Sequence, residues 1–149
     1  MDVSGNISAI LNQKGREIFS VSPDASVYDA VSLLAEKNIG ALLVMDGEKL
    51  VGLLSERDYT RKVMLRGKRS RDTIVSEIMS TDLKVVHPRI AVEDCLRLMT
   101  DKRVRHLPVL DGDKVVGVIS IGDLVKWVIS CQSAAIAHLE SYIQGGFGA

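Results

Sequence analysis

The chain has 149 residues, of which 46% are hydrophobic and 26% are charged, so it is the size of one ordinary domain or of two small units with a shared core. Nineteen basic residues balance nineteen acidic residues, which argues against a molecule-wide field for nucleic acids or anionic membranes. Aromatic residues make up 4% of the chain, so stacking platforms for single-stranded nucleic acid are scarce.

The N-terminal stretch MDVSGNISAILNQKG has neither the basic start nor the long apolar segment of a signal peptide, and no apolar run reaches membrane-spanning length. We therefore expect a cytoplasmic protein that does not use a membrane as partner. Cys95 lies in an apolar-periodic stretch typical of a buried thiol, and Cys131 is far from it in the sequence. The cysteines, histidines and carboxylates show no metal-ligand spacing, so no metal is expected.

The first half of the chain predicts a short helix over residues 7–11 and an extended piece over residues 18–21 that ends before a proline. An amphipathic helix follows, with apolar residues at helical spacing from Val27 to Leu34. The runs ALLVMD and KLVGLL are typical of strands, and Asp46-Gly47 between them predicts a tight hairpin. A second helix is expected to begin at Ser55.

The second half predicts the same elements in the same order. A helical piece over residues 75–79 precedes an extended piece over residues 84–86, and an amphipathic helix with Val92, Cys95 and Met99 on its apolar face follows. The strands HLPVLD and KVVGVI are joined by Asp111-Gly112, and a helix is expected from Ser120. The stretch RGKRSRD between the halves is a polar linker, and residues 132–143 predict a further helix before a Gly-rich end.

The two halves align without a gap at an offset of 65 residues, which places VSPDASVYDAVSLLAEKNIGALLVMDGEKLVGLLSERD on VHPRIAVEDCLRLMTDKRVRHLPVLDGDKVVGVISIGD. Identical pairs include Pro23 with Pro88 and Gly52 with Gly117. This register indicates an internal duplication. One unit of this size cannot bury the outward face of its small sheet, so we expect the two units to pack sheet to sheet about a pseudo-twofold axis.

The repeated pattern of V-x-P, an amphipathic helix and Gly-h-h-Ser-x-x-Asp after a hairpin resembles the CBS domain, and two copies in tandem resemble a CBS pair, or Bateman module. The resemblance covers about residues 7–129. It implies an α/β (α+β) fold of two pseudo-symmetric units, each a small three-stranded sheet with two helices, packed sheet to sheet. The expected boundaries are 7–66 for the first unit with the N-terminal helix, 67–74 for a linker, 75–130 for the second unit and 131–149 for a C-terminal helix and flexible tail.

The resemblance implies a non-catalytic regulatory or sensor module that binds adenosine-containing ligands, chiefly AMP or NAD(H) and also ADP or ATP, in the cleft between the units. It also implies a homodimer and a protein partner, of unknown identity, that the module regulates. The sequence has no Walker loop, G-x-G-x-x-G turn, G-x-S-x-G elbow or H-E-x-x-H motif, so we expect no enzymatic activity.

Ser55 and Asp58, like Ser120 and Asp123, have the spacing of a capping box, so each pair can serve only to start a helix. A carboxylate can also accept hydrogen bonds from ribose hydroxyls, and a helix start offers free N–H groups to a phosphate. Because the motif recurs and the resemblance points the same way, we expect Asp58 and Asp123 to bind ribose.

Arg57 and Arg61 are four residues apart on an expected helix, so they share a face that could hold a phosphate. Gly122 stands at the position equivalent to Arg57, so the sequence predicts two unequal sites. A phosphate is expected near the Ser55–Asp58 turn, and a closer approach of the ligand to the backbone is expected at the Ser120–Asp123 turn. The residues expected to bind phosphate are Ser55, Arg57, Arg61, Lys62, Arg105, His106 and Ser120.

Adenine recognition needs an apolar slot with backbone donors and acceptors, which the resemblance assigns to the start of each hairpin, NIGALLV and RVRHLPV. For Ile39 and Val104, plain core packing is the other interpretation, and both can hold together. The residues expected to bind adenine are Val21, Ile39, Gly40, Ala41, Val86, Val104, Pro108, Ile121 and Gly122.

Two other functions stay open on the sequence. Residues 57–71 hold seven cations against one acid, so an RNA- or DNA-binding protein is one alternative, although the zero net charge and few aromatic residues argue against nucleic acid as a partner. A structural dimerisation module with an empty cleft is the other.

Overall fold

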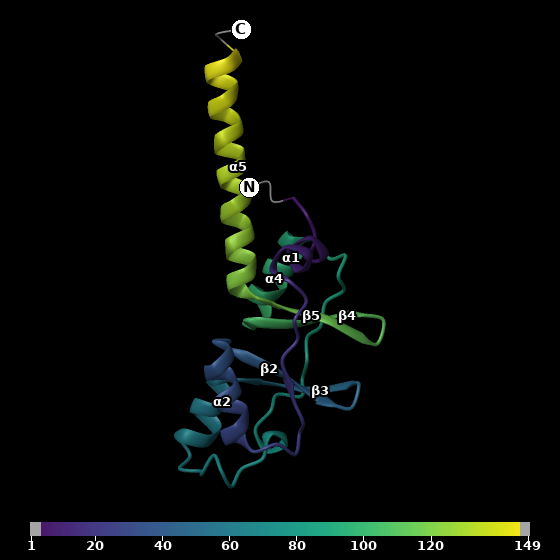
Figure 1. Cartoon of the computed structure of the whole chain (residues 1–149), viewed down its shortest axis with the longest axis vertical. Coiled ribbons are helices and arrows are strands. Elements are labelled where there is room, and N and C mark those ends of the chain that lie inside the picture. The colour runs from purple at the N-terminus through teal and green to yellow at the C-terminus, as the bar shows by residue number, and fades with distance from the viewer. Residues whose placement is uncertain (1–3, 147–149) are drawn as a thin grey trace.

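The computed structural model describes residues 4–146 and consists of two small α/β units stacked along the long axis of the molecule (Figure 1). The two sheets lie next to each other at the centre, and helices cover their outer sides. A long C-terminal helix runs past the second unit and projects from the body. This arrangement confirms the predicted α/β fold of two pseudo-symmetric units packed sheet to sheet.

The first unit is built around a three-stranded sheet in the order β1-β2-β3, with β1 parallel and β3 antiparallel to β2. Its elements are β1 (Ser20–Val21), α2 (Val27–Lys37), β2 (Ala41–Asp46), β3 (Lys49–Ser55) and α3 (Glu56–Tyr59), followed by a π-helical turn (Thr60–Met64). Gly47 has a φ of 62° at the first position of the two-residue hairpin turn, where the left-handed conformation favours glycine. The expected hairpin between two strands is therefore present.

The second unit repeats these elements with one difference, a two-stranded sheet in place of the expected three strands. Its elements are α4 (Val92–Lys102), β4 (His106–Asp111) and β5 (Lys114–Ser120). The expected strand over residues 84–86 is reduced to one parallel bridge between Val86 and Val109. In the first unit the Leu43 N–H donates to the Phe19 carbonyl at 3.3 Å, but the equivalent residue is Pro108, which has no N–H to donate.

The short helices that precede each repeat are exchanged between the two units. Helix α1 (Ile7–Lys14) buries Ile7, Ile10 and Leu11 in the core of the second unit, whereas the expected boundaries place this helix in the first unit. The 3₁₀ turn Val75–Glu77 packs Val75 into the core of the first unit. Each unit is therefore completed by a segment that lies before the other unit in the chain.

The glycine that opens each Gly-h-h-Ser-x-x-Asp motif lies under these exchanged segments. A Cβ atom on Gly117 would lie 2.7 Å from Cδ2 of Leu11, and one on Gly52 would lie 2.5 Å from Sδ of Met79 and 3.2 Å from the Ser80 carbonyl oxygen. A side chain at either position would push the exchanged segment away from the sheet. The motif glycine is thus explained by close packing between the units.

Helix α5 (Ile121–Gly146) is one continuous helix of 26 residues, so the helix expected over residues 132–143 is an extension of the helix that begins after Ser120. Leu124 is buried in the second core, and the Trp127 indole N–H donates to the Ser4 carbonyl at 2.9 Å. The last part of the expected flexible tail, residues 147–149, lies outside the described residues. No helix within residues 4–146 combines the length and hydropathy needed to cross a membrane.

Replacing Gly117 by alanine is expected to destabilise the fold by about 1 to 3 kcal/mol, because the added methyl overlaps the fully buried Leu11 side chain. Gly122→Ala is the matched control, since its Cβ would meet only Ser120 Oγ at 3.6 Å and alanine is favoured in a helix by about 0.5 to 1 kcal/mol. Urea denaturation of both variants measures the difference. Equal midpoints would contradict this explanation of the motif glycine.

Candidate functional site

Two clefts lie between the units, related by the same pseudo-symmetry as the repeats. Each cleft combines the Ser-x-x-Asp turn of one unit with the hairpin start of the other, residues 38–41 or 103–106. We call them the Asp123 cleft, of about 370 Å³, and the Asp58 cleft, of about 500 Å³. Both volumes fall within the range of about 300 to 1,000 Å³ typical of small-molecule sites.

The lining residues correspond between the clefts at the offset of the repeat, as with Ile39 and Val104. Those of the Asp123 cleft are Lys14, Gly15, Glu17, Phe19, Asn38, Ile39, Gly40, Ala41, His106, Val118, Ser120 and Asp123. Those of the Asp58 cleft are Gly40, Leu53, Ser55, Glu56, Arg57, Asp58, Ser80, Asp82, Leu83, Lys84, Arg103, Val104, Arg105, His106 and Pro108. The structure thus has two clefts where the sequence analysis expects one, because each turn faces the hairpin start of the opposite unit.

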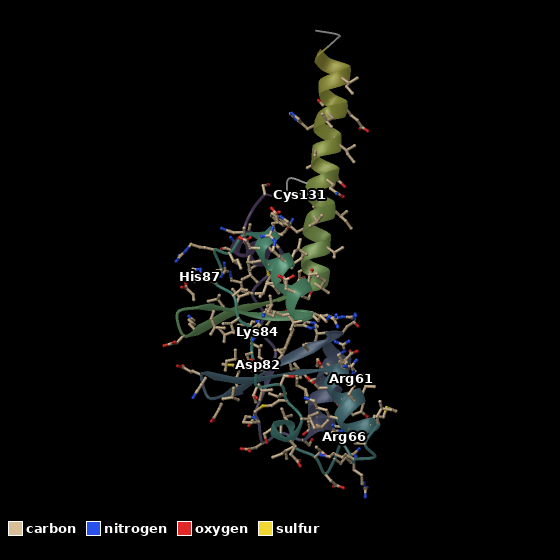
Figure 2. All side chains as sticks on the ribbon, turned by 180° about the vertical axis from the view of Figure 1, so that it is seen from behind. Arg61, Arg66, Asp82, Lys84, His87 and Cys131 are labelled. Carbon is tan, nitrogen blue, oxygen red and sulfur yellow. The ribbon has the colours of Figure 1, made fainter. Side chains whose placement is uncertain are left out.

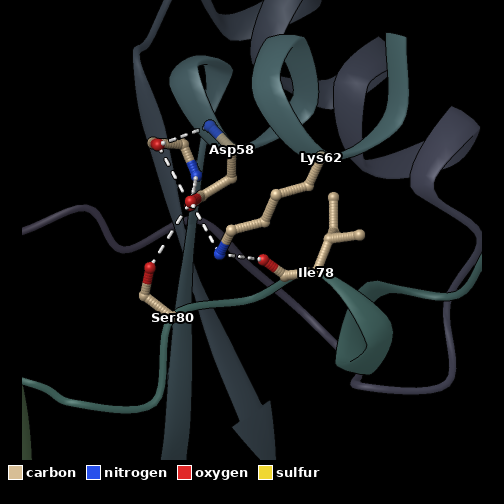
Figure 3. Close-up of polar contacts among 5 residues, drawn as sticks. Asp58, Lys62, Ile78 and Ser80 are labelled. Carbon is tan, nitrogen blue, oxygen red and sulfur yellow. Dashed lines mark hydrogen bonds and ion pairs between the residues drawn. The ribbon is translucent and has the colours of Figure 1, made fainter. Parts of the chain in front are cut away.

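In the Asp58 cleft, Ser55 and Asp58 form a closed capping box. The Asp58 N–H donates to Ser55 Oγ at 3.1 Å, and Asp58 Oδ2 accepts from the N–H and the hydroxyl of Ser55, each at 3.0 Å. The other oxygen, Oδ1, lies 3.3 Å from Lys62 Nζ and 3.4 Å from Ser80 Oγ (Figure 3). Lys62 also donates to the Ile78 carbonyl at 3.0 Å, so this lysine links the helix to the exchanged segment.

The equivalent pair in the Asp123 cleft has a different cation. Asp123 Oδ2 accepts from the Ser120 N–H at 2.8 Å and lies 2.7 Å from Lys14 Nζ, which also donates to the Val118 carbonyl at 3.0 Å. Burial by itself raises the pKa of Asp123, but the hydrogen bonds and charge of Lys14 and the Ser120 N–H outweigh burial, so the pKa lies below its ordinary value. The Asp123 side chain keeps 21% exposure and that of Asp58 13%, so both carboxylates are accessible from their clefts.

His106 and Gly40 form the wall that the two clefts share, since both residues line both clefts. A Cβ atom on Gly40 would lie 3.2 Å from the His106 ring, so a side chain at residue 40 would require the imidazole to shift slightly. Burial lowers the pKa of His106 from its ordinary value, and the Asp123 carboxylate only partly counteracts it. The imidazole is therefore neutral at pH 7 and would meet a phosphate as a hydrogen-bonding group and not as a cation.

The two clefts differ in charge. The Asp58 cleft has four cationic and three acidic side chains, whereas the Asp123 cleft has one cationic and two acidic side chains. The cations of the Asp58 cleft are Arg57, Lys84, Arg103 and Arg105. Arg103 has a left-handed backbone with φ of 54°, where its counterpart Asn38 has φ of 53° and belongs to a residue type that tolerates this conformation better. Both residues are the left-handed C-caps of their helices, α4 and α2, so the end of α4 places an arginine at this cleft.

Several residues expected from the sequence lie outside both clefts. Val21, Val86 and Ile121 pack against the two hydrophobic cores, and Gly122 is exposed without lining either cleft. Arg61 is also exposed and outside the clefts. Of the two arginines expected to share a phosphate-binding face, only Arg57 lines a cleft.

Many of the lining residues were not expected from the sequence, among them Lys14, Phe19, Lys84 and Arg103. Phe19 and Lys84 are equivalent positions, and Lys14 contacts a carboxylate 109 residues away in the chain. The repeat alignment matches the two segments that precede the V-x-P motifs, and it could have suggested that both line a cleft. It could not have shown that each segment packs against the opposite unit. Within residues 4–146, no group of three His, Cys, Asp or Glu side chains is placed to hold a metal ion.

The sequence matches the CBS domain family over residues 13–65 and again over residues 75–130, which together make up more than half of the chain. With two units that face each other across paired clefts, the molecule is a tandem CBS pair. The chain belongs to the CBS domain family. Pairs of this kind are regulatory modules.

Known proteins of the family resemble this chain over most of its length. It is 37% identical to the CBS domain-containing protein CBSX3, mitochondrial, of Arabidopsis thaliana, over 97% of this chain and 74% of that protein. A putative signal-transduction protein with CBS domains from Burkholderia ambifaria MC40-6 has 50% identity and a TM-score of 0.82, over 85% of this chain and 95% of that one. The CBS pair of protein MJ0100, solved in complex with 5′-methylthioadenosine and S-adenosyl-L-methionine, shares the fold at 23% identity with a TM-score of 0.76, over 85% and 97% of the two chains.

Lys14→Met, which copies the residue at the equivalent position of the other repeat, is expected to raise the pKa of Asp123. The variant removes the cation and leaves the burial that disfavours the charged carboxylate. In the wild type the ion pair contributes stability that is present above the unfolded pKa, near 3.8, and is lost as pH falls through the lower folded pKa. At neutral pH the variant should therefore be less stable than the wild type by up to about 1 kcal/mol. In acid, where Asp123 is protonated, the two free energies of unfolding should be equal.

Carboxyl ¹³C NMR titration measures the pKa of Asp123 directly. Urea denaturation at a series of pH values measures the difference in the free energy of unfolding. Lys102→Met, at the exposed end of α4, is the matched control and should leave the pKa of Asp123 unchanged. An Asp123 pKa that does not move in Lys14→Met would contradict the role assigned to Lys14.

Proposed function

We propose that this CBS pair is a non-catalytic sensor that binds adenosine-containing ligands, AMP or NAD(H) first and ADP or ATP next, in the two clefts between its units. One observation carries the proposal. Each cleft brings an accessible, capped carboxylate of one unit opposite the hairpin start of the other, where Ile39 or Val104 supplies an apolar side chain. Because a ligand in either cleft would contact both units, its binding would change how the two units pack against each other.

The chemistry of each cleft suits the two halves of a nucleoside. The Asp58 and Asp123 carboxylates are partly exposed at the clefts, so their oxygens can accept hydrogen bonds from the hydroxyl groups of a ribose. Ile39 and Val104 are partly buried against the hydrophobic cores and also line the clefts, so they offer an apolar surface to a base. The main chain of Gly40 and Ala41 borders the same surface and offers polar backbone groups.

The difference in charge supports unequal ligands in the two clefts. Arg57, Arg103 and Arg105 line the Asp58 cleft, so we infer that phosphate groups bind there. Lys14 is the one cation that lines the Asp123 cleft among the described residues, and Asp123 already pairs with it. That cleft better fits a nucleoside portion with little negative charge. A dinucleotide that reaches past His106 and Gly40 could use both clefts.

Nucleic-acid binding has less support, because the basic residues of the segment 57–71 do not form one face. Arg57 lines the Asp58 cleft, while the Arg71 guanidinium stacks on the Tyr28 ring at 3.8 Å and Arg69 pairs with Asp72 at 3.4 Å. Arg61 and Arg66 lie on the first unit (Figure 2), and neither lines a cleft. A scattered set of this kind does not supply the continuous patch that a phosphate backbone needs.

Isothermal titration with AMP, NADH, ATP and S-adenosylmethionine tests the proposal. We expect saturable binding of at least one ligand and a loss of about 10- to 100-fold in affinity in Asp58→Asn or Asp123→Asn, since each removes a charged acceptor for ribose hydroxyls. Asp101→Asn, exposed on α4, is the control and should bind as the wild type does. Absence of saturable binding for all four ligands, or salt-dependent binding of oligonucleotides alone, would reject the sensor function.

Arg57→Ala is expected to weaken AMP binding about tenfold and to leave adenosine binding unchanged, because the guanidinium contacts only the phosphate in this proposal. Arg61→Ala is the matched control, one arginine further along and outside both clefts. The same calorimetric titration compares the two variants with both ligands. If the two variants lost AMP affinity equally, a general charge effect would replace the specific contact.

A further inference from the structure

Helix α5 presents an exposed apolar stripe that no described part of the body covers. The stripe consists of Val125, Ile129, Ile136, Leu139 and Ile143, whose exposed fractions run from 48% to 59%. These values are high for large aliphatic side chains, because a lone monomeric helix would normally place such residues against a core. The stripe begins beside the second unit, and its last three members belong to the part of α5 that projects beyond the body (Figure 1).

The spacing of the stripe is that of a coiled coil. Successive members are four, seven, three and four residues apart, and Gln132 occupies the position that completes the alternation of three and four. In heptad terms, Ile129, Ile136 and Ile143 take position a, and Val125 and Leu139 take position d. This 3.5-residue period keeps the side chains on one seam of the helix for about 27 Å, since Ile143 lies 18 residues beyond Val125 and each step rises about 1.5 Å.

The seam points away from the protein's own body. Helix α5 contacts the second unit through Leu124, which is fully buried, and through Trp127, whose indole bonds to the Ser4 carbonyl. An α-helix turns by about 100° per residue, so Leu124 lies about 100° and Trp127 about 200° around the helix from Val125. The side chains that contact the body are therefore on other faces of the helix than Val125. Cys131 marks the level at which the helix leaves the body in Figure 2. A partner can therefore reach the whole seam without displacing a packed element.

We propose that the α5 stripe is the homodimer interface of this protein, in which the stripes of two copies pack as a parallel two-stranded coiled coil. Isoleucine at a with leucine at d favours two parallel strands, and in-register pairing sets each isoleucine against its own copy. The seam has no charged residue, and the flanking Lys126 and Glu140 would meet uncharged residues of the partner helix, so self-pairing brings no like charges together. The second copy is thus the occupant that this surface fits.

A lipid surface fits the stripe less well. An amphipathic helix that lies on a membrane normally has lysine and arginine on its polar face. From residue 132 to residue 146 the sequence has no lysine or arginine, and Glu140 is its one residue of the four charged types. The seam is also short, about two and a half heptads, so the dimer should dissociate on dilution. Because α5 is already one continuous helix from Ile121 to Gly146, pairing does not have to order it first.

Sedimentation equilibrium over a concentration series from micromolar to hundreds of micromolar tests the interface. We expect a monomer–dimer equilibrium for the wild type and loss of the dimer throughout the series in the double variant Ile136→Lys, Leu139→Lys. Ala134→Lys places the same charge on the opposite side of the helix and should keep the dimer. Circular dichroism and urea denaturation check that the double variant keeps the fold, since both positions are exposed. A monomeric wild type, or a double variant that still dimerises, would overturn the proposal.

Disulfide trapping separates the parallel arrangement from an antiparallel one. In a Cys131→Ser background, Leu139→Cys should form a covalent dimer under mild oxidation, because position d residues of parallel helices face each other. Ser141→Cys, on the outer side of the same turn, is the control and should stay uncrosslinked. Failure of Leu139→Cys to crosslink, or equal crosslinking of both variants, would overturn the parallel coiled coil.

Discussion

The close contact between each motif glycine and the exchanged segment above it holds this molecule together. Leu11 lies over Gly117 and Met79 over Gly52, so each unit is completed by a segment that precedes the other unit. The two units therefore fold as one body, and the space between them is defined by backbone packing. Because each segment continues directly into a cleft wall, at residues 14–19 and 80–84, the shape of both clefts depends on this exchange.

Pseudo-symmetry supplies two similar clefts, and a few substitutions make them different. The Ser-x-x-Asp turn has the same capping geometry on both sides, but the carboxylate pairs with Lys62 in one cleft and with Lys14 in the other. One partner comes from the same helix and the other from a distant segment, so the two carboxylates respond to different parts of the chain. Duplication thus supplies two sites on one scaffold, and the side chains around them decide which ligand chemistry each site accepts.

Much of the fold follows from local rules that the sequence displays. The hairpin glycines, the helical spacing from Val27 to Leu34 and the gapless repeat predict the elements and their pairing in two units, as the structure has them. Prediction was weaker where one residue changes a hydrogen bond, as at Pro108, which removes a strand from the second sheet. It was also weaker at the arginine pair, because which of Arg57 and Arg61 lines a cleft depends on how the opposite unit packs against the Ser55–Asp58 turn.

The sequence by itself determined the family, the two-unit fold and the two capped carboxylates, because these depend on short-range spacing and on a repeat that any alignment reveals. It also contained the seam of α5, since a heptad is a local pattern. Only the tertiary structure decided which hairpin start faces which carboxylate, that Lys14 pairs with Asp123, and that His106 borders both clefts. Those relations join residues far apart in the chain, and they depend on which unit each preceding segment packs against.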